Sequence, residues 1–108
     1  MIVVLAALSG AIAVAAGAFG AHGASGSAAE WLKTGAQYQL VHVVAALVAI
    51  RMEARGPACL FVVGAAIFAL TLYAMALGAP RWFGAITPIG GALLICGWLW
   101  LAWSAARP

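Results

Sequence analysis

The chain has 108 residues, of which 68% are hydrophobic and only 6% are charged. A soluble domain averages roughly 45–50% apolar and about 25% charged residues, so this composition excludes a soluble globular protein. The net charge of +3 comes from a few residues that flank apolar runs, where basic residues of membrane proteins normally lie. It therefore does not indicate a nucleic-acid partner, and the partner that the composition predicts is the lipid bilayer.

The charged residues separate four long uncharged runs, which are residues 1–29, 34–50, 56–80 and 82–106. A membrane-spanning helix needs roughly 17–25 mainly apolar residues, and each run provides that length. We therefore expect an all-α membrane protein that forms one integral membrane domain, an antiparallel four-helix transmembrane bundle with short loops. The expected spans are about residues 2–22, 34–51, 57–77 and 88–106.

The first span contains small residues spaced alternately four and three apart, which lie along one seam of a helix: Ala6, Gly10, Ala13, Gly17, Gly20 and Ala24. In lipid, close backbone approach along small residues is a main cause of helix association. The seam therefore predicts a packing face. Together with a glycine of the second helix, the predicted helix-packing residues are Gly10, Ala13, Gly17, Gly20 and Gly35.

The second helix has both a start signal and a polar seam. Ser27 and Glu30 match a capping box, which predicts a helix start near Ala28, outside the hydrocarbon. Further along, Tyr38 and His42 share the seam of small residues that begins at Gly35. Because an ionisable group that faces lipid is costly, we expect this seam to point inward.

Proline and glycine mark the last two helices. Pro57 indicates the start of the third helix, and Thr87 followed by Pro88 indicates an N-cap and first helical residue for the fourth. The segment 82–86 is too apolar for a free loop, so we expect it to lie at the interface or to dip into the membrane against protein. Trp98 and two neighbouring tryptophans are typical of an aromatic belt.

An antiparallel arrangement gathers the polar side chains in one half of the bundle, near the first and third loops. The candidate ligand-binding residues are His22, Gln37, Tyr38, Gln39, His42, Tyr73 and Thr87. Two interpretations stay open, namely hydrogen bonds that set helix register, or a site for a lipid headgroup, quinone or small anion. A two-histidine metal or haem site is disfavoured, because His22 ends its helix at the surface whereas His42 lies about 13 Å deeper than Lys33. We predict no metal, no cofactor and no catalytic residue.

Several sequence blocks carry a family resemblance. They are Gly17-Ala-Phe-Gly-Ala-His22, Leu32-Lys-Thr-Gly-Ala-Gln-Tyr-Gln39 with His42, Thr71-Leu-Tyr73, and Phe83-Gly-Ala-Ile-Thr-Pro-Ile-Gly-Gly91. The chain resembles the YgdD/YwdK-like family of small bacterial membrane proteins, a domain-of-unknown-function family with mitochondrial relatives. Thr71 stands where the family pattern has serine, and it keeps the hydroxyl. The resemblance implies a multi-pass membrane protein of unassigned activity and supplies no catalytic residues.

The sequence thus predicts a non-enzymatic protein of the bacterial inner membrane that acts through a bound lipid, a membrane-protein partner or a homo-oligomer. The alternative is a small ligand- or ion-handling protein that uses the polar half around His42, with a lipid headgroup, quinone, anion or proton as ligand. Three side-chain cations fall on the surface shared by the termini and the second loop, and two on the opposite surface. The excess predicts cytoplasmic termini.

Overall fold

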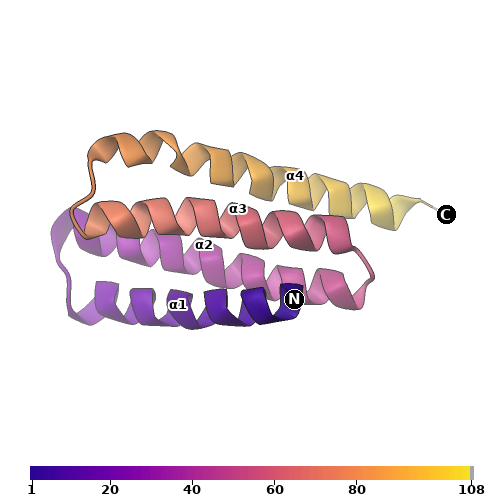
Figure 1. Ribbon diagram of the computed structural model, residues 1–108, viewed down its shortest axis with the longest axis horizontal. Coiled ribbons are helices and arrows are strands. Elements are labelled where there is room, and N and C mark those ends of the chain that lie inside the picture. The colour runs from indigo at the N-terminus through magenta and orange to yellow at the C-terminus, as the bar shows by residue number, and fades with distance from the viewer. Residues whose placement is uncertain (108) are drawn as a thin grey trace.

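A computed structural model describes residues 1–107 and contains four long α-helices joined by short connections. The elements are α1 (Ile2–His22), α2 (Gly26–Arg51), α3 (Arg55–Ala76), the short 3₁₀ helix η1 (Arg81–Ala85) and α4 (Thr87–Ala106). Successive long helices run in opposite directions, so that both termini and the α2–α3 connection lie at one end (Figure 1). No strand occurs within the described part of the chain. The predicted all-α antiparallel architecture is confirmed.

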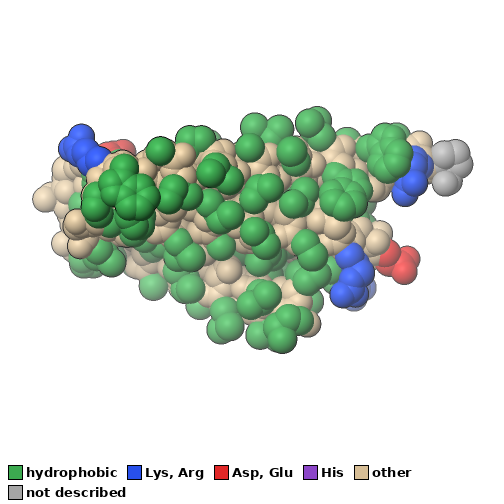
Figure 2. Space-filling model, turned by 45° about the horizontal axis from the view of Figure 1, so that its top comes forward, with side chains coloured by type: hydrophobic (Ala, Val, Ile, Leu, Met, Phe, Trp, Pro, Cys, Tyr) green, Lys and Arg blue, Asp and Glu red, His purple; other side chains and the backbone are tan. Residues whose placement is uncertain are grey.

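The distribution of charge fits a membrane protein. Charged side chains gather at the two ends of the molecule, and the surface between them is hydrophobic (Figure 2). Three helical segments are long and apolar enough to cross a membrane, namely α1, α3 and the stretch Arg81–Ala106 that contains η1 and α4. The other long helix, α2, has 26 residues but is more polar, because it carries two glutamines and a histidine in its middle.

Two helix starts differ from the prediction. Helix α2 begins at Gly26, ahead of Ala28, and no side chain caps it, so the predicted capping box is wrong. The turn is made instead by Gly26, whose φ of +61° lies in the left-handed region that glycine adopts at little cost. Thr87 is the first residue of α4 rather than a capping residue before it, and its hydroxyl contacts Thr71 of α3.

The helices pack in chain order, with broad interfaces between α1 and α2, α2 and α3, and α3 and α4. Figure 1 shows α4 lying along α3 on the side away from α1. The larger of two apolar clusters lies toward the end of the termini and consists mainly of alanines around the ring of Phe61: Ala6, Val43, Ala46, Ala49, Ala58, Phe61, Val62, Ala65 and Leu94. The smaller cluster contains Leu32, Ala69 and Tyr73. Because α4 rests mainly on α3, one side of α2 is left partly uncovered.

Candidate functional site

His42 is buried in the middle of α2, and both of its ring nitrogens are hydrogen-bonded. Its Nδ1 lies 2.7 Å from the carbonyl oxygen of Tyr38, one turn earlier, and its Nε2 lies 3.0 Å from the indole Nε1 of Trp98 on α4. The indole can only donate, so Nε2 accepts and Nδ1 carries the proton that is donated to the carbonyl. His42 is therefore a neutral link between α2 and α4 with no free lone pair.

Gln39 and Tyr73 form a second polar pair, at the α2–α3 interface. The Tyr73 hydroxyl donates to the Gln39 Oε1 at 2.8 Å, and Gln39 is only 1% exposed. Gly35, one turn earlier on α2, makes room for the tyrosine ring, since a Cβ placed there would lie 2.7 Å from the Tyr73 Cε1. This pair is closed and fills its space, so it serves packing and leaves no room for a ligand.

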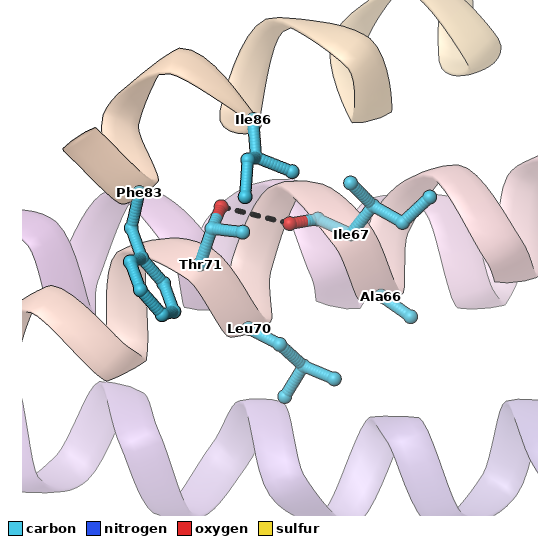
Figure 3. Close-up of a pocket in the computed structure, with 6 residues that line it drawn as sticks. All are labelled: Ala66, Ile67, Leu70, Thr71, Phe83 and Ile86. Carbon is cyan, nitrogen blue, oxygen red and sulfur yellow. Dashed lines mark hydrogen bonds between the residues drawn. The ribbon is translucent and has the colours of Figure 1, made fainter. Parts of the chain in front are cut away.

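Thr71 and Thr87 form the third pair, between α3 and the start of α4. Their hydroxyl oxygens lie 2.6 Å apart, and Thr71 also reaches the carbonyl oxygen of Ile67 at 2.8 Å. Each hydroxyl also has a carbonyl oxygen within reach, Ile67 for Thr71 and Phe83 for Thr87, so either hydroxyl can donate to the other. Beside Thr71 lies an apolar pocket of about 270 Å³, bounded by Phe83 and Ile86 (Figure 3). It offers no polar group that is free to select a ligand.

A groove runs between α2 and α4 above the side chain of Phe68. We call it the α2–α4 groove; its volume is about 480 Å³, and it is lined by Tyr38, His42, Phe68, Gly91, Leu94, Ile95 and Trp98. A recess of about 220 Å³ adjoins it, lined by Gln37, Tyr38, Val41 and His42. Tyr38 and His42 belong to both, so they form the ridge between groove and recess.

Tyr38 stands at this ridge with its ring held and its hydroxyl unused. The ring packs on Phe68 at a centroid distance of 4.6 Å and lies parallel to the imidazole of His42. Tyr38 is 46% exposed, and Gln37 beside it is exposed as well. The side-chain hydrogen bonds within residues 1–107 do not include the Tyr38 hydroxyl or the Gln37 amide. These are the two polar groups of the groove region that the protein leaves available.

The predicted site residues thus fall into separate groups. His42, Tyr38 and Gln37 lie at the groove, whereas Gln39, Tyr73 and Thr87 are committed to helix contacts. His22 is exposed at the end of α1 and shares no hydrogen bond or ring contact with His42 in the described part of the chain.

The predicted packing residues lie between α1, α2 and α3. Gly10, Gly17 and Gly20 face Val43, Ala36 and Leu32 of α2, respectively. Ala13 is buried on the same helix, and Gly35 faces α3 as described.

Sequence reasoning missed the residues that place α4. Trp98 was expected in an aromatic belt, yet it bonds to His42. The glycines of the α3–α4 contact, Gly64, Gly90 and Gly97, were not identified either. The sequence did contain a signal for these positions, because residues seven apart share one face of a helix. Gly90 and Gly97 are seven residues apart, and so are Gly91 and Trp98.

Comparison with known proteins places the chain among bacterial membrane proteins. A UPF0382 membrane protein of Haemophilus influenzae is 41% identical over 95% of this chain and 91% of its own length. The UPF0382 inner membrane protein YgdD of Escherichia coli K12 is 36% identical over 96% of this chain and 88% of its own length. A UPF0382 membrane protein of Staphylococcus haemolyticus is 37% identical over 94% and 91%, respectively. No solved structure matches the chain.

Residues 16–91 match the family described as "Protein of unknown function (DUF423)". This segment includes every block on which the resemblance in sequence was based, and it includes His42 and Tyr38, whereas Trp98 lies beyond it. The match covers more than half of the chain, and the relatives align over nearly its whole length. The chain therefore belongs to the DUF423 family of membrane proteins, whose function is unknown.

Proposed function

We propose that this protein is a non-enzymatic, multi-pass protein of the bacterial inner membrane that acts by holding a membrane amphiphile in the α2–α4 groove. The observation that carries the proposal is the composition of the groove. Its walls are apolar and aromatic, and one edge presents an unused hydroxyl and an unused amide at Tyr38 and Gln37. An amphiphile combines the same two properties, a long apolar part and a few polar groups at one end.

The depth of these two polar groups supports a partner from outside the chain. Gln37 and Tyr38 lie about 9–11 Å further along α2 than Trp31, a residue type typical of the membrane interface. At that depth water becomes scarce, and a polar group without a hydrogen bond is costly. Gln37 and Tyr38 are exposed on the protein surface. A hydrogen-bonding ligand that enters from the membrane would remove this cost.

In this proposal His42 shapes the groove and does not bind the ligand. Its bond to Trp98 joins the two helices that form the walls and closes the groove at mid-membrane depth. Both imidazole nitrogens are already bonded, so the ring offers no base to an incoming substrate. The arrangement therefore favours binding over catalysis, and His42 sets the shape of the groove rather than handling the ligand itself.

The proposal includes a topology. Helix α2 is about 39 Å long and packs between α1 and α3, so we place it across the membrane with its neighbours. Arg51, Arg55 and Arg107 outnumber Lys33 and Arg81, which supports cytoplasmic termini. The mouth of the groove, near η1, then opens toward the outer leaflet. A C-terminal reporter that is active only in the periplasm would contradict this orientation.

The proposal is tested by a substitution that fills the α2–α4 groove with a side chain. A Cβ at Gly91 would approach only Phe68 Cδ2, at 3.9 Å, so the backbone accepts a side chain there and Gly91→Leu projects it into the groove. Ala92→Leu, one residue further on the exposed face of α4, is the matched control.

Native mass spectrometry from a mild detergent, followed by lipid extraction, should show a retained amphiphile in the wild type and in Ala92→Leu but not in Gly91→Leu. Equal retention in all three proteins would refute the proposal. Loss of a copurifying protein or of a second copy in Gly91→Leu, with no lipid change, would replace it by a partner-docking function.

A further inference from the structure

We infer that the amphiphile belongs to the quinone class, a neutral planar ring with carbonyl groups and an apolar tail, and that its ring lies in the α2–α4 groove with one carbonyl oxygen on the Tyr38 hydroxyl. This inference rests on the proposed function and specifies its ligand. Three properties of the groove carry it, namely its aromatic lining, its unused hydroxyl and the lack of charge among the residues that line it.

The first property is the number of rings in the lining of the groove. Four of its seven lining residues have a ring: Tyr38, His42, Phe68 and Trp98. Aromatic rings attract one another in offset-stacked or edge-to-face arrangements, beyond the gain from burying their area. Gly91 also lines the groove, and a Cβ there would approach only the Phe68 ring, at 3.9 Å. The missing side chain leaves space beside the rings for a flat ligand.

The rings are held in place before a ligand arrives. The Phe68 ring contacts that of Tyr38 at a centroid distance of 4.6 Å, and the planes of Tyr38 and His42 are parallel within 2°. The Trp98 ring is held by its bond to His42 and by contact with Phe61 at a centroid distance of 4.7 Å. Because these contacts already restrict the rings, a rigid planar ligand binds against them at a small cost in side-chain entropy.

The apolar pocket beside Thr71 has a contrasting composition. Its lining is mainly aliphatic, with Phe83 as its one aromatic residue, and it has no polar group that is free to bind a ligand. Such a pocket suits a saturated acyl chain, which gains from the burial of apolar area alone. The α2–α4 groove adds rings and a hydroxyl, for which an acyl chain has no use. Its composition therefore favours a ligand with a ring and a hydrogen-bond acceptor.

The second property is the hydroxyl of Tyr38, which lies on the ridge between groove and recess. The side-chain hydrogen bonds within residues 1–107 do not include this hydroxyl. A phenol donates one hydrogen bond, and a carbonyl oxygen accepts one. Because a donor that stays unpaired away from water is costly, this bond gives a quinone carbonyl a preferred position at the edge of the groove.

The third property is the lack of charge in the lining. None of the residues that line the groove has a charged side chain, apart from His42, which is neutral when it accepts from Trp98. Aromatic rings can also surround a quaternary ammonium, which is attracted to their faces. In the topology proposed above, however, the groove lies within the hydrocarbon, where a cation without a countercharge is costly. A lining without a carboxylate therefore favours a neutral ring.

The test compares three probes that share a decyl chain and differ in the ring and the carbonyl. They are decylubiquinone, decylbenzene, which has a ring but no carbonyl, and decyl acetate, which has a carbonyl but no ring. Their dissociation constants are measured by equilibrium dialysis of the delipidated full-length protein in detergent, with empty micelles as the blank. Decylubiquinone should bind about fivefold more tightly than either other probe, since a hydrogen bond and an aromatic contact are each worth about 1 kcal/mol.

Two matched pairs of variants assign the preference to residues. Tyr38→Phe should weaken decylubiquinone about fivefold and leave decylbenzene unchanged, because only the quinone uses the hydroxyl. Tyr73→Phe, which removes a hydroxyl outside the groove, should leave the affinity of the folded protein for both probes unchanged. Phe68→Leu should weaken both ring probes but not decyl acetate, whereas Phe83→Leu, at the pocket beside Thr71, should weaken neither ring probe.

The outcomes separate this inference from the proposed function. If Gly91→Leu displaces the copurified amphiphile but decylubiquinone binds no more tightly than the other two probes, the quinone inference is wrong and the proposed function stands. If Gly91→Leu displaces nothing, both fail. Tighter binding of decyltrimethylammonium than of decylubiquinone would show that the rings serve a cation and would overturn the inference, as would an equal effect of Tyr38→Phe and Tyr73→Phe on decylubiquinone.

Discussion

The two outer helices are held in different ways. Helix α1 lies on α2 through small residues, with Gly17 facing Ala36 and Gly20 facing Leu32, and no side-chain hydrogen bond within residues 1–107 connects it to another helix. Helix α4 also meets its neighbour through glycines, but two hydrogen bonds add to that contact. Thr87 bonds to Thr71 at the start of α4, and Trp98 bonds to His42 about halfway along α4.

The difference shows what the polar residues accomplish. Contact between small residues brings α1 and α2 together along their length. The two bonds of α4 fix its position at two depths while the α2–α4 groove stays open between α4 and α2. At α4, therefore, hydrogen bonds hold a helix beside an open groove, whereas α1 rests on close contact between small residues. Substitutions at each interface test this distinction.

The largest effect should follow from Gly90→Ala in α4. A Cβ at this position would lie 2.4 Å from the backbone nitrogen of Phe68 and 2.7 Å from the carbonyl oxygen of Gly64. Backbone atoms of a packed helix cannot move aside as a flexible side chain can, so α4 must shift away from α3. We expect a loss of about 3 kcal/mol in the free energy of unfolding, measured in detergent. Gly91→Ala is the control and should change stability little, and equal losses in both variants would show that the contact is not specific to Gly90.

The second largest effect should follow from Gly17→Leu in α1. Even a Cβ at Gly17 would lie 3.3 Å from the Cβ of Ala36, which is already tight, and the rest of a leucine has no space. Because no side-chain hydrogen bond among residues 1–107 ties α1 to a neighbouring helix, α1 should separate from α2, at a cost of about 1–3 kcal/mol. Ala18→Leu, on the exposed side of α1, is the control. An unchanged thermal midpoint and oligomeric state for Gly17→Leu would show that this seam faces lipid.

The sequence predicts the helices and their antiparallel order well, because apolar length and proline or glycine boundaries are local properties. It also predicts that Tyr38 and His42 share one side of α2, but the expectation that both point inward is wrong for Tyr38. Its side chain is 46% exposed at the groove, because α4 rests mainly on α3. It does not predict that His42 pairs with Trp98, which is 56 residues away, because a tryptophan near a helix end fits an aromatic belt equally well. The groove follows from how far α4 stands from α2, and that distance depends on the long-range contacts of Gly90 and Thr87.

A smaller effect should follow from Tyr73→Phe at the α2–α3 interface. The change removes the hydroxyl that donates to Gln39 and leaves the Oε1 of this buried amide without a hydrogen bond. We expect a loss of about 1 kcal/mol or slightly more, since an unsatisfied buried acceptor costs about 1–3 kcal/mol. Tyr38→Phe removes the same hydroxyl from a tyrosine whose oxygen is not bonded to the protein, so it should leave stability unchanged. If Tyr38→Phe lowered the thermal midpoint more than Tyr73→Phe, the tyrosine whose hydroxyl stabilises the fold would be Tyr38 at the groove.

The smallest effect on stability should follow from Trp98→Phe, which keeps an aromatic ring against Phe61 but removes the indole N–H that bonds to His42. Hydrogen bonds between membrane helices are worth about 0.6 kcal/mol on average, so the expected loss is of that size. Trp103→Phe, at an exposed position nearby, should cost less. The decisive measurement is the double-mutant cycle with His42→Ala, since the two changes should be less than additive by about the value of the bond. If the Trp98–His42 bond sets the distance between α4 and α2, Trp98→Phe should also lower lipid retention without unfolding the protein. If the free-energy losses of the two substitutions are additive and lipid retention is unchanged, α4 is positioned by its glycines alone.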